Sequence, residues 1–223
     1  MPPGQAVRIA RAYLPEHPLG NRWDYYYSRA KLGSDPLYPG VSEALRGTSA
    51  PLLDLGCGLG LLAHTLRADG IGLSYRGVDS DAAKIRRAGR AAARVGLDQA
   101  GFAVMDLARE LPEHRGSVAM LDVLQFIPYP AQARAIDAMI AMLTPGARLV
   151  IRTGLDDGTG RARVTRAVDV FARVLGWMNA MPRYYPDGEA LRARLRDAGL
   201  RVEFTPLYGR TPFNNWRIVA ARD

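Results

Sequence analysis

The chain has 223 residues, of which 48% are hydrophobic and 23% charged, and its formal net charge is +8. These values are typical of a folded globular protein and exclude a disordered or fibrous chain, and no apolar run approaches the roughly 18 residues of a membrane span. Because the N-terminus also lacks a charged-then-apolar leader, we expect a cytoplasmic protein without a membrane span.

The basic charge comes almost entirely from arginine, because Lys31 and Lys84 are the only lysines. Nucleic acid or an acidic carrier protein would suit such a charge. Arginine-rich chains with little lysine more often reflect genome composition, so we do not expect nucleic acid as a partner, whereas a carrier protein stays open. Four arginines recur along one predicted helix as a solvated face: Arg86, Arg87, Arg90 and Arg94.

The first predicted segment, residues 1–47, is rich in aromatic residues and proline, and we expect an irregular lid that faces the substrate. Residues 48–154 alternate apolar runs with helical patterns, which predicts βαβ units and a parallel sheet that binds a cofactor. The predicted strands are 51–55, 74–78, 101–105, 117–121 and 147–151, and the predicted helices are 59–68, 82–95 and 131–143.

Residues 155–186 interrupt the alternation, and we expect a substrate-facing insert there. A helix over 187–198 and two strands, 200–206 and 213–221, are predicted to close the chain as a helix and a β-hairpin. We therefore expect residues 1–223 to form a single domain.

Residues 52–60, Leu-Leu-Asp-Leu-Gly-Cys-Gly-Leu-Gly, contain the most informative motif. An apolar strand that carries Asp54 leads into three alternating glycines: Gly56, Gly58 and Gly60. Glycine lets the backbone approach a ligand closely, and the next helix offers free N–H groups, so a nucleoside-containing ligand is predicted. The dinucleotide fingerprint would need its third glycine at Leu61, which argues against a nicotinamide cofactor.

Cys57, within this loop, is the only cysteine, which excludes an intramolecular disulfide and a cysteine metal cluster. A small residue is sterically favoured between two glycines, so we assign no reactive thiol to it. We expect no metal, since no Asp-Asn pair follows the fifth predicted strand to hold magnesium.

The spacing acidic-x-Gly-x-Gly-x-Gly resembles motif I of the class I S-adenosylmethionine-dependent methyltransferases, and the similarity covers about residues 51–151. The resemblance implies an α/β, Rossmann-like, doubly wound seven-stranded sheet, mostly parallel with an antiparallel last strand, with helices on both faces. It also implies S-adenosylmethionine as the cofactor and S-adenosylhomocysteine (SAH) as its product.

Two acidic residues at strand ends are expected to hold the nucleoside. Asp79 can accept both hydrogen bonds of a ribose diol. Its alternative role is to cap the next helix, which Ser80 or Asp81 can also do. The resemblance places Asp106 on the adenine amino group and the backbone N–H of Leu107 on a ring nitrogen, while Ser80 stands where the family more often has an apolar residue.

The fourth predicted strand leads into Asp122 and Val123, which the resemblance places at the methyl end of the cofactor. Gln125 stands where the family often has a histidine, so a histidine base there is excluded. The absence of an Asn/Asp-Pro-Pro-Tyr/Phe sequence argues against methylation of nucleobase or glutamine amino groups. The expected cofactor-binding residues are Asp54, Gly56, Cys57, Gly58, Gly60, Asp79, Ser80, Asp106, Leu107, Asp122 and Val123.

No motif identifies a catalytic residue. Methyl transfer is an in-line displacement at an activated carbon, so alignment and water exclusion matter most. Where a base is needed, the candidates are His17, Tyr25, Tyr26, Tyr27 and Asp122. His64, within a predicted helix, and His114, in a turn, are expected to be structural.

Aromatic residues at 23–27 and in the insert are the expected walls of the acceptor pocket, and they suit an apolar or aromatic molecule. In the insert these residues are Phe171, Trp177, Met178, Met181, Tyr184 and Tyr185. We therefore predict methyl transfer to oxygen, carbon or nitrogen of a small acceptor. The alternatives are an RNA methyltransferase, supported only by net charge, and a nicotinamide-binding oxidoreductase or catalytically silent nucleotide-binding module.

Overall fold

The computed structural model describes residues 1–156, 183–207 and 214–222. The N-terminal region holds α1 (Pro3–Ala10), the 3-10 turn η1 (Arg11–Tyr13), α2 (Trp23–Ser34) and α3 (Leu37–Leu45). The alternating region holds β1 (Leu52–Leu55), α4 (Leu61–Ala68), β2 (Tyr75–Asp79), α5 (Ala82–Arg94), β3 (Ala100–Val104), β4 (Ser117–Leu121), the 3-10 turn η2 (Leu124–Phe126), α6 (Tyr129–Met142) and β5 (Arg148–Gly154). The last described elements are α8 (Gly188–Asp197), β6 (Arg201–Pro206) and β7 (Asn215–Ala221).

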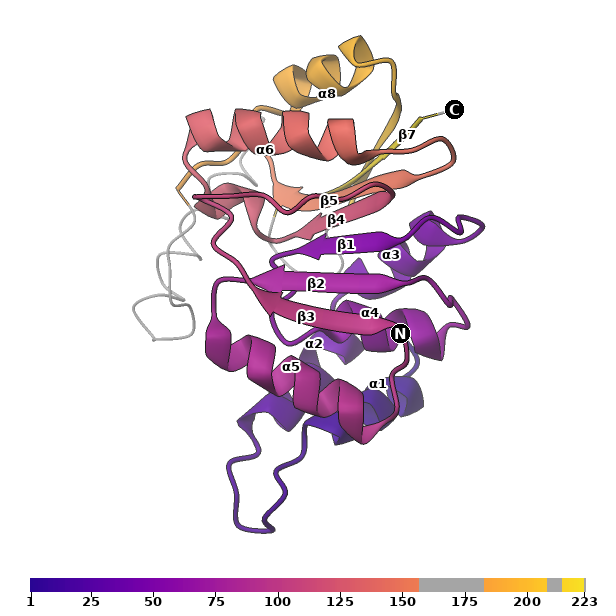
Figure 1. Ribbon diagram of the computed structural model, residues 1–223, viewed down its shortest axis with the longest axis vertical. Helices are drawn as coiled ribbons and strands as arrows, with labels where there is room; N and C mark the ends of the chain where they lie inside the picture. Colours follow the sequence, from indigo (N-terminus) through magenta and orange to yellow (C-terminus); the bar gives the residue numbers. More distant parts are fainter. Residues whose placement is uncertain (157–182, 208–213, 223) are drawn as a thin grey trace.

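The strands form one seven-stranded sheet in the order β3-β2-β1-β4-β5-β7-β6 (Figure 1). Strands β1 to β5 are parallel, and β7 is antiparallel to both β5 and β6. β1 lies between β2 and β4, with Leu52 opposite Tyr75 of β2 and Ser117 of β4. The predicted sheet, mostly parallel with an antiparallel last strand, is therefore confirmed. Open sheets of this kind bind ligands at their carboxyl edge, where the strand order reverses.

Both faces of the sheet are covered by helices, because neighbouring residues on a strand point to opposite faces. On β5, Leu149 and Ile151 belong to a core that includes residues of α6 and α8. Val150, between them, belongs to a second core that includes residues of α1 to α5. The central strands are consequently buried on both sides, which explains their continuous apolar sequences.

The expectation of an irregular N-terminal segment is wrong, because much of residues 1–47 is helical. Proline does not prevent this: Pro3 is the first residue of α1, a position whose N–H has no intrahelical partner. In α3, Leu37, Val41 and Leu45 are buried at a spacing of four residues, which is a helical repeat. This repeat was the signal that the aromatic and proline content obscured.

His64 is a packed residue of α4, as expected. Its ring lies 5.4 Å from that of Tyr13, centroid to centroid, and the residue is 4% exposed. The Nε2 atom has no hydrogen-bond partner among the described residues. Burial therefore lowers the pKa of His64 to about 4.

We expect His64 to reduce the stability of the fold in acid. The unfolded histidine takes up a proton near pH 6.5, whereas the buried one resists protonation down to about pH 4, so the free energy of unfolding falls as the pH drops through this window. Urea unfolding near neutral pH and near pH 4.5 should show a loss for the wild type that is about 2 kcal/mol larger than for His64→Phe. The same pH dependence in both proteins would contradict this account.

Gly60 is expected to be intolerant of a side chain. It precedes α4 with φ +71, and a Cβ there would lie 2.5 Å from Cε1 of Phe102. Gly70 has φ +76 but no atom within 4 Å of such a Cβ. Urea unfolding should therefore show a loss of about 1–2 kcal/mol for Gly70→Ala, from backbone strain alone. For Gly60→Ala, overpacking should add about 1–3 kcal/mol. Equal losses in the two variants would show that Phe102 yields without cost.

Candidate functional site

The loop between β1 and α4 is held by hydrogen bonds to the end of β2. The backbone N–H groups of Gly56 and Cys57 both donate to the carbonyl of Val78, at 2.8 and 2.9 Å. The next N–H, that of Gly58, donates to Oδ2 of Asp79 at 2.9 Å. Three consecutive residues of the loop are therefore fixed at the carboxyl edge of the sheet.

Gly58 is the glycine of this loop that faces open space. Its φ is +56, and no atom lies within 4 Å of a Cβ built there. Gly56 instead closes against the protein, since a Cβ there would lie 2.2 Å from Cγ2 of Val123. A ligand can therefore approach the loop at Gly58, while Val123, an expected cofactor residue, supports the loop at Gly56.

Asp79 connects the loop to the start of α5. Its Oδ1 accepts from the N–H of Asp81 at 2.9 Å, while its Oδ2 accepts from Gly58. The helix cap is Asp81, whose carboxylate accepts from the backbone N–H groups of Ala83 and Lys84. The capping alternative for Asp79 is therefore wrong. A carboxylate has about four acceptor sites, so two remain for a ligand.

Asp106 follows β3 and lies at the same edge of the sheet. The residue before it, Met105, donates its N–H to the carbonyl of Asp79 at 3.0 Å. The carboxylate of Asp106 accepts from the N–H of Ala108 at 3.0 Å and pairs with Arg109 at 3.4 Å. Asp106 is exposed and Leu107 half-buried, so the expected adenine residues are adjacent to the expected ribose residue.

Asp54 lies beneath the loop rather than on its open side. It is 2% exposed, and its Oδ2 accepts from the hydroxyl of Tyr75 at 2.6 Å. Burial raises the pKa of Asp54 to about 7, although the bond from Tyr75 lowers it. Its Oδ1 has no partner among the described residues. Cys57 lies over Gly77, where a Cβ would be 2.7 Å from its sulfur, and burial raises the pKa of its thiol.

Asp122 belongs to a network of four charges at the ends of β4 and β5. Its Oδ2 lies 3.2 Å from Nζ of Lys31 and also accepts from Arg152. Asp35 completes the network, at 3.3 Å from Lys31 and 3.5 Å from Arg152. Asp122 itself has φ +61, and its N–H donates to the carbonyl of Arg152 at 2.8 Å. The network joins α2 and the residue after it to the carboxyl edge of the sheet.

This network argues against Asp122 as a general base. Burial raises the pKa of Asp122, but Arg152 and Lys31 outweigh this and lower it. A carboxylate held by two cations has little affinity for a proton. His17 is no better placed, because it lies on the exposed loop before α2, where its Nδ1 accepts from the N–H of Leu19 at 3.2 Å.

Helix α2 is also tied to α5, through Asp24 and Arg87 at 3.5 Å. Because β1 lies between β2 and β4, α2 is anchored on both sides of the glycine loop. Its inward face carries Asp24, Ser28 and Lys31, at helical spacing, and Ser28 is fully buried. The aromatic residues expected to line the acceptor pocket differ in their exposure on α2. Trp23 and Tyr26 are 64% and 55% exposed, and Tyr27 is 43% exposed. Tyr27 is close enough to Lys31 to contribute to the raised pKa of that lysine. Tyr25, half-buried, stacks edge-on against Tyr26.

The end of the expected insert docks next to the site. The N–H groups of Arg183 and Tyr184 donate to the carbonyl of Gln125 at 3.0 and 3.1 Å. The side chain of Gln125 is buried and accepts from the hydroxyl of Thr153 at 3.0 Å. Tyr185 is buried against Gly154. The remaining expected wall residues lie outside the described residues: Phe171, Trp177, Met178 and Met181.

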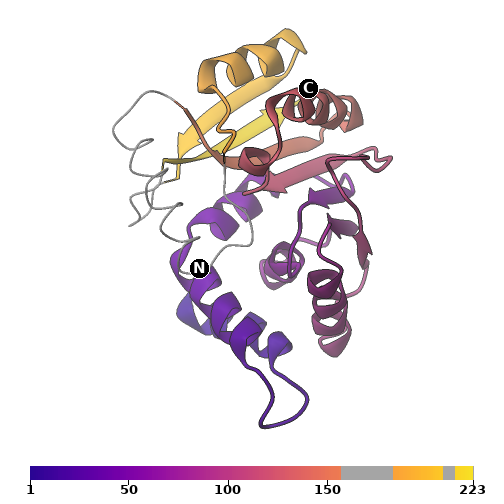
Figure 2. The ribbon, with the colours of Figure 1, turned by 90° about the vertical axis from the view of Figure 1, so that its left-hand side faces the viewer.

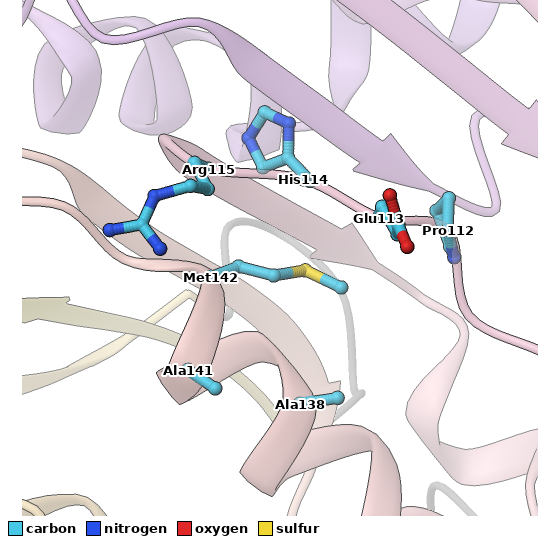
Figure 3. A pocket seen from close by; sticks show the side chains of 7 residues that line it. All are labelled: Pro112, Glu113, His114, Arg115, Ala138, Ala141 and Met142. Atoms are coloured by element: carbon cyan, nitrogen blue, oxygen red, sulfur yellow. The ribbon is translucent and has the colours of Figure 1, made fainter.

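A hollow of about 390 Å³ lies between the segment before β4 and the last turns of α6 (Figure 3). His114 lines it, with Nε2 at 2.9 Å from the carbonyl of Ser117, the first residue of β4. This hollow is at the amino edge of the sheet and is separate from the glycine loop. In the part of the chain that the structure describes, no group of three His, Cys, Asp or Glu could hold a metal ion, and no helix is long and apolar enough to cross a membrane.

Four residues of the site were not foreseen from the sequence: Lys31, Asp35, Tyr75 and Arg152. Arg152 follows three apolar residues of β5, which is a weak signal that it has a buried partner. Tyr75 gave no such signal, because β2 also carries Arg76 and Asp79. Lys31 is one of two lysines in an arginine-rich chain. The partner of each residue is distant in the sequence, so the pairing itself was not predictable.

Comparison with known proteins assigns the family. Residues 33–204 match the family model of the methyltransferase domain, and this is more than half of the chain. The ubiquinone biosynthesis O-methyltransferase of Xylella fastidiosa (strain M23) is 26% identical over 192 residues, which cover 82% of this chain and 73% of that protein.

Two solved structures show the same fold. Magnesium protoporphyrin IX methyltransferase from Synechocystis PCC 6803, with bound SAH, has a TM-score of 0.64 at 22% identity, over 97% of this chain and 93% of that one. An O-methyltransferase family protein from Burkholderia thailandensis has a TM-score of 0.65 at 22% identity, over 90% of this chain but only 59% of that longer one. With the seven-stranded sheet and its glycine loop, these matches leave no support for the nicotinamide-binding alternative. The chain belongs to the methyltransferase domain family and is a class I S-adenosylmethionine-dependent methyltransferase.

Proposed function

We propose that this enzyme methylates an oxygen atom of a small, apolar or aromatic acceptor. The support for oxygen is that curated relatives are named as O-methyltransferases. The support for an apolar or aromatic acceptor is that Tyr184 and Tyr185 lie beside Gln125 and Gly154, next to the carboxyl ends of β4 and β5. Neither source supports RNA as the acceptor.

The carboxyl edge fits the cofactor. No atom lies within 4 Å of a Cβ built on Gly58, which supports a close approach of the adenosyl group there, and Asp79 has acceptor sites left for a ribose diol. Asp106 and the N–H of Leu107 are neighbours of Asp79 and suit the adenine edge. Asp122 and Val123 are proposed to border the methionine end. Asp54 and Cys57 support the loop from beneath.

When bound, S-adenosylmethionine supplies a methyl group activated by the positive sulfonium. The protein's share of the reaction is then to align the acceptor and to exclude water, which together are worth about 7–11 kcal/mol in favourable cases. Helix α2 is suited to exclude water, because ion pairs fix it on both sides of the glycine loop.

The described residues favour an acceptor that loses its proton easily. None of the three histidines is available as a base: His17 lies in an exposed loop, His64 is buried against Tyr13 in α4, and His114 precedes β4 at the amino edge. Asp122 is committed to two cations. A phenolic hydroxyl ionises far more readily than an aliphatic one, so a phenol is the acceptor type that needs least help from a base.

The proposal is tested by incubating the purified enzyme with S-adenosylmethionine and four acceptor classes: substituted phenols, aliphatic alcohols, aromatic amines and total RNA. Release of SAH with phenols, and with a product methylated on oxygen, is the expected result. Transfer to RNA or to nitrogen alone would overturn the proposal for the acceptor and leave the cofactor assignment intact.

We expect Asp79→Ala to weaken SAH binding at least tenfold, because a hydrogen bond to a charged acceptor is worth about 1.5–3 kcal/mol. Asp98→Ala, at an exposed aspartate that precedes β3 and so lies at the amino edge of the sheet, should change the dissociation constant less than threefold. Isothermal titration calorimetry measures both, and circular dichroism confirms that each variant is folded. An unchanged dissociation constant in folded Asp79→Ala would show that the ribose lies elsewhere.

Lys31→Met should lower kcat/KM for methyl transfer at least tenfold. The substitution leaves Asp35 and Asp122 to share the single cation Arg152, so α2 is held less firmly at the carboxyl edge. Lys84→Met is the matched control, because Lys84 is the other lysine and pairs only weakly, at 3.9 Å, with Asp81. If both variants keep wild-type kcat/KM, the network has no part in catalysis.

A further inference from the structure

A group of exposed apolar side chains on the N-terminal region is not used by the proposed reaction. Leu19 is 91% exposed, Trp23 64% and Tyr26 55%. Trp23 and Tyr26 lie on α2 and face away from the inward residues Asp24, Ser28 and Lys31. We call Leu19, Trp23 and Tyr26 the apolar tip. Single exposed apolar residues are ordinary, but three large ones within eight residues of sequence, among them a nearly fully exposed leucine and a tryptophan, indicate an interaction site.

The backbone that carries the apolar tip is well fixed. In the turn before α2, the N–H of Gly20 donates to the carbonyl of His17 at 2.9 Å, and the N–H of Trp23 donates to Oδ1 of Asn21 at 2.8 Å. The Arg22 side chain donates to the carbonyl of Pro18 at 3.3 Å. This turn presents Leu19 to solvent, and a partner surface that covered the side chain would remove its apolar area from water.

The tip also stands out from the body of the protein. Figures 1 and 2 both show the loop between η1 and α2 projecting beyond α1 and α5. The base of this loop is anchored to α5, because the Arg94 side chain donates to the carbonyls of Ala12 and Leu14, and Arg87 pairs with Asp24. The tip is therefore held on a projection whose base rests on α5.

The surface beside the projection is basic. Helix α5 carries Lys84 and four arginines but no acidic residue between Ala82 and Arg94. Arg86 and Arg90 are exposed, as are Arg11 and Arg22 at the two ends of the loop. Within the described ranges, none of these four arginines is paired with a carboxylate. Glu16 is the one exposed acidic residue of the loop. The excess of positive charge around the tip is complementary to an anionic surface.

We propose that the apolar tip and the arginines of α5 bind the surface of an anionic lipid bilayer. Tryptophan and leucine insert at the boundary between headgroups and acyl chains, and nearby arginines are attracted to anionic headgroups. A protein partner is less suitable, because a stable interface needs about 800 Å² on each side, and three side chains on a narrow projection offer a far smaller apolar surface. This inference goes beyond methyl transfer and does not depend on the acceptor.

The test is flotation of the purified full chain with vesicles of phosphatidylcholine alone or with about one quarter phosphatidylglycerol, at low and high salt. Wild type is expected to float with the anionic vesicles at low salt and to be released by high salt. Leu19→Asp should lower the partition coefficient at least tenfold, and Arg86→Glu with Arg90→Glu should do the same. Val104→Asp, at an apolar residue 54% exposed on β3, and Arg134→Glu, on the exposed side of α6, are the matched controls and should bind like the wild type.

Insertion has its own readout. Addition of anionic vesicles should shift tryptophan emission to shorter wavelength in the wild type, and Trp23→Phe should abolish the shift while it still floats. Calorimetry should show that Leu19→Asp binds SAH like the wild type. The variant is then folded, and its failure to float is a loss of lipid binding rather than misfolding. The proposal is overturned if the wild type does not bind anionic vesicles or if Leu19→Asp floats equally well. It is also overturned if light scattering shows a dimer that Leu19→Asp dissociates, because the tip would then bind a second copy of the chain.

Discussion

The structure depends on how the end of β1 is closed onto the end of β2. The open position of the glycine loop follows from the hydrogen bonds of Gly56 and Cys57 to Val78 and of Gly58 to Asp79. These bonds use the N–H groups of the loop internally, so the loop is rigid before any ligand arrives. Preorganisation of this kind reduces the ordering that binding would otherwise require. Asp79 is thus both a structural acceptor and the proposed ribose ligand.

Charge has two separate uses on helix α2. Its inward residues are balanced, since two cations and two carboxylates meet at the ends of β4 and β5. Beside its outward residues, the surface of α5 carries a net positive charge, because the basic residues of α5 have few acidic neighbours. The same helix therefore contributes a nearly neutral wall to the reaction site and an apolar, positively flanked surface to solvent. Net charge alone does not distinguish these two environments.

The fold was largely predictable from the sequence, and the reason is local. Strand and helix patterns, the glycine loop and the closing hairpin are all signals within about ten residues, and their order determines the sheet. Residues at strand ends, such as Asp79 and Asp106, could be placed because parallel strands bring their carboxyl ends to one edge. The pairs Asp54 with Tyr75 and Lys31 with Asp122 could not, because each joins residues far apart in the sequence. Helices α1 and α3 were missed because proline in a first helical turn looks the same in sequence as proline in a loop. Helix α2 has no proline, but its three consecutive tyrosines do not form a helical apolar repeat.

The double anchoring of α2 has a consequence for how this chain can vary in length. Each residue of an α-helix adds about 100° of rotation and about 1.5 Å of rise. One inserted residue between Asp24 and Lys31 would therefore turn one ion pair away from its partner whenever the other is kept. The loop before α2 has no such restriction, since only its base is bound to α5. A change in the length of that loop would therefore move the apolar tip but leave both ion pairs of α2 in place.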